Sequence, residues 1–372
     1  MEQSLWTRRQ ILKAAGAAGG LAAASSFLSP GIFLAADKER QRGETLLGRF
    51  GPWSEPQQIA QLASTAMDFH PAISRNGLSL YFTTSRFPGF IQAIAVIHRS
   101  DRDAPWDPST LANVTPLNFA GRSTGVPNLT PDGHTMYFQS GRPSASLGVG
   151  HGHLWVSNRQ HNHEDVGPFG WEPPQPVPGT LNTAEPSQWN QSAATYFRDP
   201  DRGAGSMYFS QFFGKGTFGD PNQDFDIYVS RQNDDGSFGP GVRVEALEPA
   251  EPGEPEPTEV FVKKFSRQTR TAISRDGREM FITSNRQGGL TYSGDPIENI
   301  WVATRSDTST EDWKVADSPV PGLNSGFGEG GPALSGDGTT IYFFSARPTT
   351  PGQLPQPQNW QLWMSTREKL DD

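Results

Sequence analysis

Residues 51–64 read GPWSEPQQIAQLAS. This stretch decides the fold because it comes before the first repeat unit, whereas its other copies each come last in a unit. Stretches of the same kind, with an aromatic anchor, proline and a leucine near the end, occur at 106–118 (WDPSTLANVTPLN), 171–182 (WEPPQPVPGTLN), 238–247 (FGPGVRVEAL) and 313–324 (WKVADSPVPGLN). Each of these later copies closes a longer unit. The chain ends shortly after residue 367 without such a copy, so residues 51–64 are predicted to supply it.

The units themselves begin with a second phrase. Its copies are PAISRNGLSLYFTTSR (71–86), PNLTPDGHTMYFQSGR (127–142), TAISRDGREMFITSNR (271–286) and PALSGDGTTIYFFSAR (332–347). Asn-Gly and Asp-Gly favour tight hairpin turns because both central residues tolerate positive φ, and the flanking runs are typical of strands in a packed sheet. Each phrase is therefore predicted to be a β-hairpin. A degenerate copy at 191–212 keeps the two strands around a longer turn from Asp199 to Gly203.

A third phrase follows each hairpin and is predicted to be a third strand. It reads AIAVIHR (93–99), HLWVSNR (153–159), DIYVSR (226–231), NIWVATR (299–305) and QLWMSTR (361–367). With the proline-containing stretch as the outer strand, each unit has four strands, which predicts an all-β, five-bladed β-propeller of antiparallel blades. The first strand would complete the last blade and remove the open sheet edges. Two stacked sandwiches would use the same strands but would not explain the displaced copy.

These phrases resemble the repeat of the TolB-like, WD-repeat-like propeller family: Pro, two residues, Ser-Pro-Asp-Gly, and an apolar-aromatic strand that ends in Ser-x-Arg. The resemblance covers nearly all of the chain after its N-terminal segment. The third copy departs from the pattern in its proline and its turn, and the fourth lacks the proline. The resemblance implies a propeller. It leaves the function open, because the family includes binding modules, docking proteins and enzymes.

The N-terminal segment predicts export. Arg8 and Arg9 precede an Ala/Gly-rich apolar run, as in a twin-arginine signal, so we expect a signal peptide at 1–36, a linker at 37–48 and the propeller at 49–372. The mature protein is then expected in the periplasm or outside the cell, with no membrane span. A net charge of −9 argues against nucleic-acid binding, and the absence of cysteine excludes disulfides and thiolate chemistry.

In a propeller, the loops between second and third strands and the crossovers between blades share one face, where we expect function. Asp68 and Glu329 hold equivalent positions in blades that ring closure makes neighbours. With Glu185, and His70 as a base, they are candidate catalytic groups of a glycosidase-like site. The alternative interpretation is a solvated acidic rim and a structural histidine.

Two stretches are candidate metal sites for calcium or zinc. His151 and His153 could place two imidazoles on one side of a strand. Asp220, Asn222, Asp224 and Asp226 stand at alternate positions, as oxygen ligands do in the first half of a calcium loop, although the glycine and distal glutamate of such a loop are missing. The alternative interpretations are exposed loop histidines and an aspartate that begins a strand.

Aromatic residues predicted to lie in loops of the functional face could stack on sugars or receive apolar side chains of a partner: Trp189, Phe212, Tyr292, Phe327 and Trp360. Equally, they could fill gaps between blades. The arginines that recur at equivalent positions are expected to hold blades or loops together.

The function predicted from these features is a binding or docking module that presents a loop-rich face to a protein or a glycan. The alternative is a carbohydrate-active hydrolase or lyase that uses Asp68, Glu185 and Glu329. A purely structural envelope protein is a third hypothesis, and it predicts no concave site.

Overall fold

The computed structural model describes residues 49–146, 152–159, 170–182, 189–200, 202–203, 205–213, 224–249, 267–292, 295–348 and 360–370. The predicted export signal and linker lie outside these residues. Phe50–Lys369 form one compact unit, to which the following description refers. No helix in the described ranges has the length and apolar character needed to cross a membrane.

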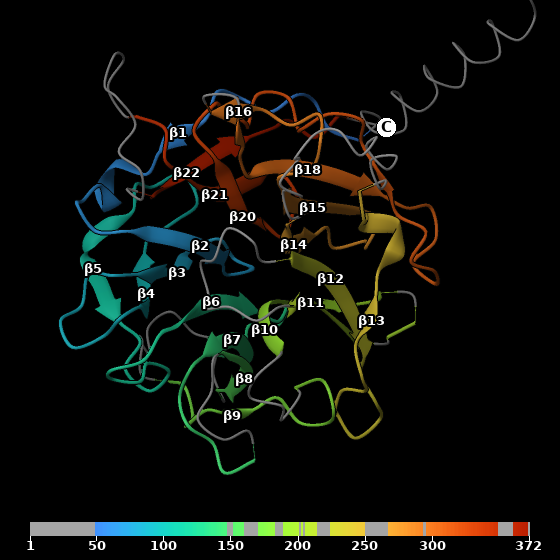
Figure 1. Cartoon of the computed structure of the whole chain (residues 1–372). Helices are drawn as coiled ribbons and strands as arrows, with labels where there is room; N and C mark the ends of the chain where they lie inside the picture. Colours follow the sequence, from blue (N-terminus) through green and yellow to red (C-terminus); the bar gives the residue numbers. More distant parts are fainter. Residues whose placement is uncertain are drawn as a thin grey trace, which may run out of the picture. The chain divides into compact units, whose positions relative to one another are not determined.

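The predicted five-bladed propeller is confirmed (Figure 1). Each blade is an antiparallel sheet of four strands, and the first strand of each contacts its counterparts around the axis. Blade 1 contains β2 (Asp68–Ile73), β3 (Ser79–Thr84), β4 (Ala93–His98) and β5 (Asp107–Asn113). Blade 2 contains β6 (Thr124–Leu129), β7 (Thr135–Ser140), β8 (His153–Asn158) and β9 (Gln175–Pro176).

The remaining blades follow the same order. Blade 3 contains β10 (Trp189–Arg198), β11 (Gly205–Phe213), β12 (Asp224–Arg231) and β13 (Val242–Arg243). Blade 4 contains β14 (Gln268–Ile273), β15 (Glu279–Ser284), β18 (Asn299–Thr304) and β19 (Lys314–Val315), with a small hairpin of β16 (Thr291–Tyr292) and β17 (Asp295–Pro296) in its loop. Blade 5 contains β20 (Glu329–Leu334), β21 (Thr340–Ser345) and β22 (Gln361–Thr366).

The displaced stretch closes the ring as predicted. β1 (Gln57–Gln58) pairs antiparallel with β22, placing Gln57 opposite Met364 and Gln58 opposite Trp363. The contact continues on both sides, since the amide of Ile59 donates to the carbonyl of Leu362 (2.9 Å) and that of Ser54 to the carbonyl of Thr366 (2.7 Å). The outer edge of β22 is thereby covered by the start of the propeller.

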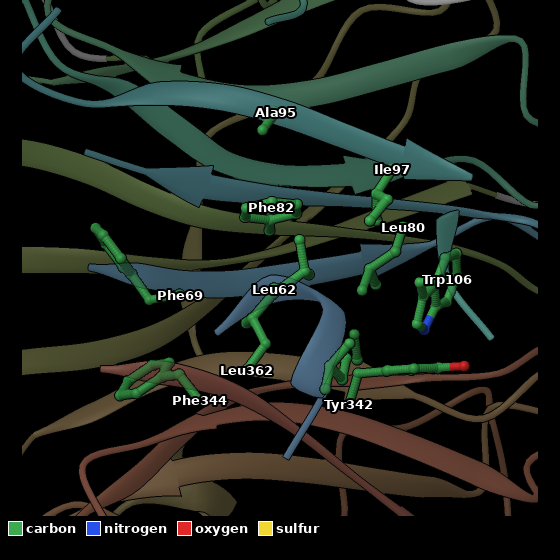
Figure 2. Close-up of a cluster of buried hydrophobic side chains, with 12 residues drawn as sticks. Leu62, Phe69, Leu80, Phe82, Ala95, Ile97, Trp106, Tyr342, Phe344 and Leu362 are labelled. Carbon is green, nitrogen blue, oxygen red and sulfur yellow. The ribbon is translucent and has the colours of Figure 1, made fainter. Parts of the chain in front are cut away.

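The hydrophobic core is divided into five clusters, and each cluster lies between two neighbouring blades. Between blades 5 and 1, for example, Phe82 and Leu80 face Tyr342 and Phe344 (Figure 2). Burying one such side chain contributes about 1.5–3 kcal/mol. Because the core belongs to the interfaces, no blade can bury its apolar face alone, which explains why the repeats must form a ring.

The Asp-Gly hairpins form with a different turn from the one expected. Only the glycines have positive φ, for example 74° at Gly133, and the preceding Asp132 does not. The Thr130 hydroxyl donates to Asp132 Oδ1 (2.6 Å), and the Gly133 amide donates to the Thr130 carbonyl (2.8 Å). The aspartate therefore acts through its side chain, which stabilises a turn that ends in a left-handed glycine.

A feature that the sequence did not reveal is a bulge in every innermost strand. One residue per strand takes the left-handed conformation, with φ between 50° and 61°: His70, Val126, Ala193, Arg270 and Gly331. The strand register shifts at this point in all five hairpins. We call these five residues the axial ring. Bulges bend a strand and redirect its side chains, and here they do so around the propeller axis.

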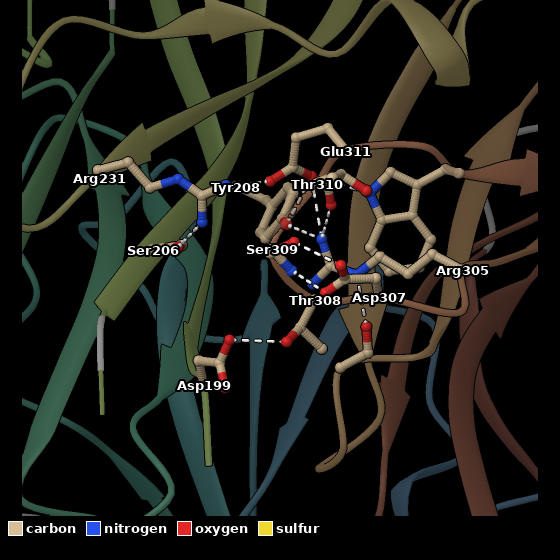
Figure 3. A network of polar contacts seen from close by, with 12 residues as sticks. Asp199, Ser206, Tyr208, Arg231, Arg305, Asp307, Thr308, Ser309, Thr310 and Glu311 are labelled. Carbon is tan, nitrogen blue, oxygen red and sulfur yellow. Dashed lines mark hydrogen bonds and ion pairs between the residues drawn. The ribbon is translucent and has the colours of Figure 1, made fainter. Parts of the chain in front are cut away.

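The recurring arginines bind across blade boundaries, which confirms their predicted structural role. Nη2 of Arg286 donates to the carbonyl of Leu247 in the preceding blade (2.7 Å), and Arg86, Arg142 and Arg347 contact the equivalent leucine carbonyls. In the second set, Arg305 stacks on Trp313 (4.2 Å) and donates to the Tyr208 hydroxyl of the neighbouring blade (3.1 Å). Figure 3 shows this network between blades 3 and 4.

Candidate functional site

The start of each innermost strand lies beside the loop before the third strand of the preceding blade. The amide of Asp68 donates to the carbonyl of Trp360 (2.9 Å), and the amide of Glu329 to that of Glu298 (3.0 Å). The crossovers and these loops therefore share one face, as predicted, and we call it the crossover face. The opposite face carries the Asp-Gly hairpins and is called the hairpin face.

Asp68 begins β2 on the crossover side and is completely buried. It accepts hydrogen bonds from the Thr84 hydroxyl (2.6 Å) and from Arg86 Nε (2.9 Å), and Arg86 Nη2 also contacts it. Burial raises the pKa of Asp68, while Arg86 and Thr84 oppose that shift. The carboxyl is thus enclosed by its own blade and is not exposed on an open rim.

Glu329 begins β20 and is equally buried. Its carboxylate accepts hydrogen bonds from the Ser325 amide (2.7 Å) and the Ser345 hydroxyl (2.7 Å), and it pairs with Arg347 (3.1 Å). The predicted equivalence with Asp68 is confirmed, and β2 and β20 are neighbours around the axis. Each acid nevertheless forms an ion pair within its own blade.

His70 is part of the axial ring and is 5% exposed. Its ring packs against Phe69 (4.4 Å between centroids) and Phe344 (5.1 Å). Burial, together with the charge of Arg270, lowers the pKa of His70 well below its usual value. The imidazole therefore stays neutral near pH 7. His70 is only two residues from Asp68 in sequence, but within the described residues it forms no hydrogen bond with the Asp68 carboxyl. Glu185 lies outside the described residues.

Some of the predicted metal ligands lie outside the described residues, and the others are placed by the structure. His151 and Asp220 lie outside the described residues, as does the side chain of Asp224. His153 begins β8, is buried, and its Nδ1 lies 3.4 Å from Gln191 Oε1. Across the described ranges, no group of three or more His, Asp or Glu side chains is placed to hold a metal ion.

Asp226 is a buried member of a charged cluster beside the outer strand of blade 3. Arg243 lies 3.1 Å from Asp226 and 3.0 Å from Glu248, so one arginine serves two carboxylates. Burial and the charge of Glu248 raise the pKa of Asp226 to about 7. The strand β12 begins at Asp224, so the interpretation of Asp226 as the first residue of a strand is wrong, and Asp226 lies opposite Gln211 inside the sheet.

Three of the predicted loop aromatics belong to strands instead. Trp189 begins β10, Phe212 lies in β11, and Tyr292 lies in β16. The first two were misplaced because β10 and β11 span 10 and 9 residues, where the equivalent strands of the other blades span six. Phe327 is half-buried in the crossover before β20. Trp360 is half-buried against Phe69 and Phe344, filling the gap between blades 5 and 1.

Sequence reasoning missed Glu298, which precedes β18 on the crossover face. It is half-buried, and its carboxylate makes no ion pair or hydrogen bond with the part of the chain that the structure describes. Its charge reaches Arg270, whose pKa it raises against the effect of burial. The sequence pattern gave no reason to select Glu298, because its equivalents in blades 1 and 5 are Gln92 and Trp360.

Comparison with known proteins places the fold among glycoside hydrolase propellers. A thermostable family-43 glycoside hydrolase is 14% identical with a TM-score of 0.53, covering 85% of this chain and 93% of its own. An α-L-arabinofuranosidase from Lactobacillus brevis is 15% identical with a TM-score of 0.50, covering 81% and 90%. A further glycoside hydrolase is 13% identical with a TM-score of 0.52, covering 88% and 95%.

These similarities show a shared fold. No family model matches the chain, and no curated protein matches it by sequence. The resemblance of the repeat to TolB-like propellers and the export signal therefore stay predictions.

Proposed function

We propose that this protein is a carbohydrate-active enzyme that hydrolyses glycosidic bonds on its crossover face. The observation that carries the proposal is the likeness of the whole ring to glycoside hydrolase propellers, with TM-scores of 0.50–0.53 over more than four fifths of the chain. The argument rests on fold analogy, which favours a reaction class without fixing the substrate. The α-L-arabinofuranosidase among the similar structures makes α-L-arabinofuranosides the first substrates to test.

The carboxylates divide into two groups by their surroundings. Asp68 and Glu329 are enclosed with Arg86 and Arg347, which also hold crossover carbonyls, so we assign them to positioning the crossovers at the axis. Glycoside hydrolysis needs a carboxylic acid that protonates the leaving oxygen and a carboxylate that activates water or attacks the sugar. We propose Glu298 and Glu185 for these two roles, since Glu298 precedes β18 on the crossover face and Glu185 is expected from the sequence to lie in a crossover between blades.

Hydrolysis is tested with the mature protein on aryl α-L-arabinofuranosides and on arabinose-containing polysaccharides. Glu298→Gln and Glu185→Gln are each expected to lower kcat/KM by about 100-fold or more, the usual contribution of a general acid or base. Their melting temperatures should stay close to that of the wild type. Glu172→Gln, an exposed position in blade 2, is the matched control and should keep full activity.

A folded wild-type protein that hydrolyses none of these glycans would contradict the proposal.

The burial of Asp68 and Glu329 favours a second candidate, a glycan-binding propeller without turnover. Saturable binding on a glycan array together with absent hydrolysis would support this second function.

A further inference from the structure

A cavity of about 650 Å³ lies at the propeller axis, lined by all five innermost strands. Its lining begins at the five residues of the axial ring and ends at the hairpin face, near Arg75 and Gly336. The cavity is walled by the second halves of the innermost strands. Asp68, Glu329 and Glu298 do not line it, so the cavity has a different lining from the proposed hydrolytic site, and Glu298 acts on it only through the effect of its charge on Arg270.

The charged residues that line the cavity favour an anion. Four arginines line it, against two carboxylates: Arg75, Arg198, Arg270 and Arg275 against Asp132 and Asp199. Both carboxylates are engaged, because Asp132 accepts from Thr130 (2.6 Å) and Asp199 accepts from Thr308 (2.8 Å). The axis is thus positively charged in a chain whose net charge is −9.

Arg270 is the cation of the axial ring, and its side chain is half-buried. Its Nη1 is buried and has no hydrogen-bond partner, and no carboxylate of the described chain lies within ion-pair distance of its guanidinium. Burial lowers the pKa of Arg270 to about 9, although the charge of Glu298 opposes that shift. Leaving a guanidinium unpaired in such a site costs free energy, because its hydration is lost without replacement.

His70 also lines the cavity, and in the axial ring Gly331 of blade 5 lies between it and Arg270. It is more than nine-tenths buried, and its Nδ1 has no hydrogen-bond partner. A neutral imidazole still carries one N–H that can donate to an anion. Three of the five ring amides are already used, since those of Val126, Arg270 and Gly331 bond to hydroxyls of Thr83, Ser210 and Thr283. Arg270 can therefore donate to an anion only through its side chain.

We propose that the axial cavity is a binding site for a small oxoanion, held by the guanidinium of Arg270 with His70 as a second hydrogen-bond donor. The planar fork of arginine matches the oxygens of a carboxylate or a phosphate group. The exposed Arg75, Arg198 and Arg275 at the hairpin face attract the anion to the entrance. This inference does not depend on the proposed hydrolysis.

The site is tested by thermal unfolding at constant ionic strength, with sodium chloride exchanged for 10 mM inorganic phosphate, acetate or glucuronate. We expect phosphate or one of the carboxylates to raise the melting temperature by about 3 °C, as binding to the native state does. The ion that acts distinguishes a phosphate site from a carboxylate site. In Arg270→Met this rise should disappear, while Arg122→Met, an exposed arginine outside the cavity, should keep it.

The Arg270→Met variant also separates an anion site from a structural arginine. Without oxoanions, it should unfold at the same temperature as the wild type or higher, because it removes an unpaired, half-buried charge. A variant that is less stable in every buffer and still responds to oxoanions would overturn the proposal. Direct titration of the wild type by calorimetry covers the case of a variant that does not fold, and no saturable binding below 10 mM would equally overturn it.

Discussion

At the residue scale, the carboxylates of Asp68 and Glu329 are both held by arginines of their own blade. Their equivalence and their adjacency around the ring could be predicted from the repeat. Their enclosure could not, because the arginines were recognised only as a recurring pattern and the repeat does not say which partner each one binds. Sequence spacing placed the right residues at the axis, but the surrounding hydrogen bonds decide whether a carboxyl is free to react.

The Arg86–Asp68 pair predicts a pH-dependent loss of stability on removal of the arginine. Arg86→Met leaves the completely buried Asp68 without its cation and should lower the free energy of unfolding by about 3 kcal/mol at pH 8. The pKa of Asp68, already raised by burial, rises further without Arg86, so the loss should shrink as the pH falls and the carboxyl takes up a proton.

Urea unfolding of this variant at pH 5 and pH 8 measures both effects, with Arg122→Met as the exposed control. The double variant Arg86→Met/Asp68→Asn should recover part of the stability at pH 8. A loss that is equal at both pH values would contradict the assignment of the effect to an unpaired carboxylate.

Asp226 predicts a second pH effect. Its pKa is raised from the usual 3.8 of an aspartate to about 7 in the folded protein, so the stability that its protonated form contributes is present at low pH and is lost as the pH rises between these values. Asp226→Asn should remove this dependence, and relative to the wild type it should gain about 1 kcal/mol or more between pH 4.5 and 8, since one pKa unit corresponds to about 1.4 kcal/mol. Parallel pH profiles of the melting temperature for the two proteins would show the prediction to be wrong.

At the element scale, the strands and hairpins follow from the repeated phrases, whereas the bulges of the axial ring do not. The five left-handed positions are occupied by His, Val, Ala, Arg and Gly, which share no side-chain property. Positive φ is costly for a β-branched residue such as Val126. Tertiary packing around the axis therefore imposes the bulge on all five strands, and no local pattern could have predicted it.

Two left-handed glycines separate the effect of backbone conformation from that of packing. At Gly277 a Cβ would lie 2.2 Å from the ring of Phe197 in the neighbouring blade, whereas at Gly89 it would meet nothing within 4 Å. We expect Gly89→Ala to cost about 1–2 kcal/mol for the left-handed conformation alone. Gly277→Ala should cost about 1–3 kcal/mol more because of the clash. Chemical denaturation of both variants checks the difference, and equal losses would argue against close packing of this hairpin on blade 3.

At the scale of the whole molecule, the ring determines which residues become neighbours. Residues 57–58 pair with residues 363–364 at the far end of the chain, and the resulting interface between blades 5 and 1 holds a core cluster of its own. Closure could be predicted because one copy of a repeat was displaced to the start. The axial cavity could not, since it depends on where five bulges direct their side chains.

The absence of cysteine from the chain makes ring closure directly measurable. In Gln57→Cys/Met364→Cys the new cysteines replace residues that are opposite each other on β1 and β22, at a separation that suits a disulfide. Closure predicts rapid, quantitative disulfide formation in the folded monomer and, because the bond closes a long loop, a free energy of unfolding raised by about 4 kcal/mol or more. Free thiols that persist under oxidising conditions, or cross-links only between molecules, would contradict a ring closed by the N-terminal strand.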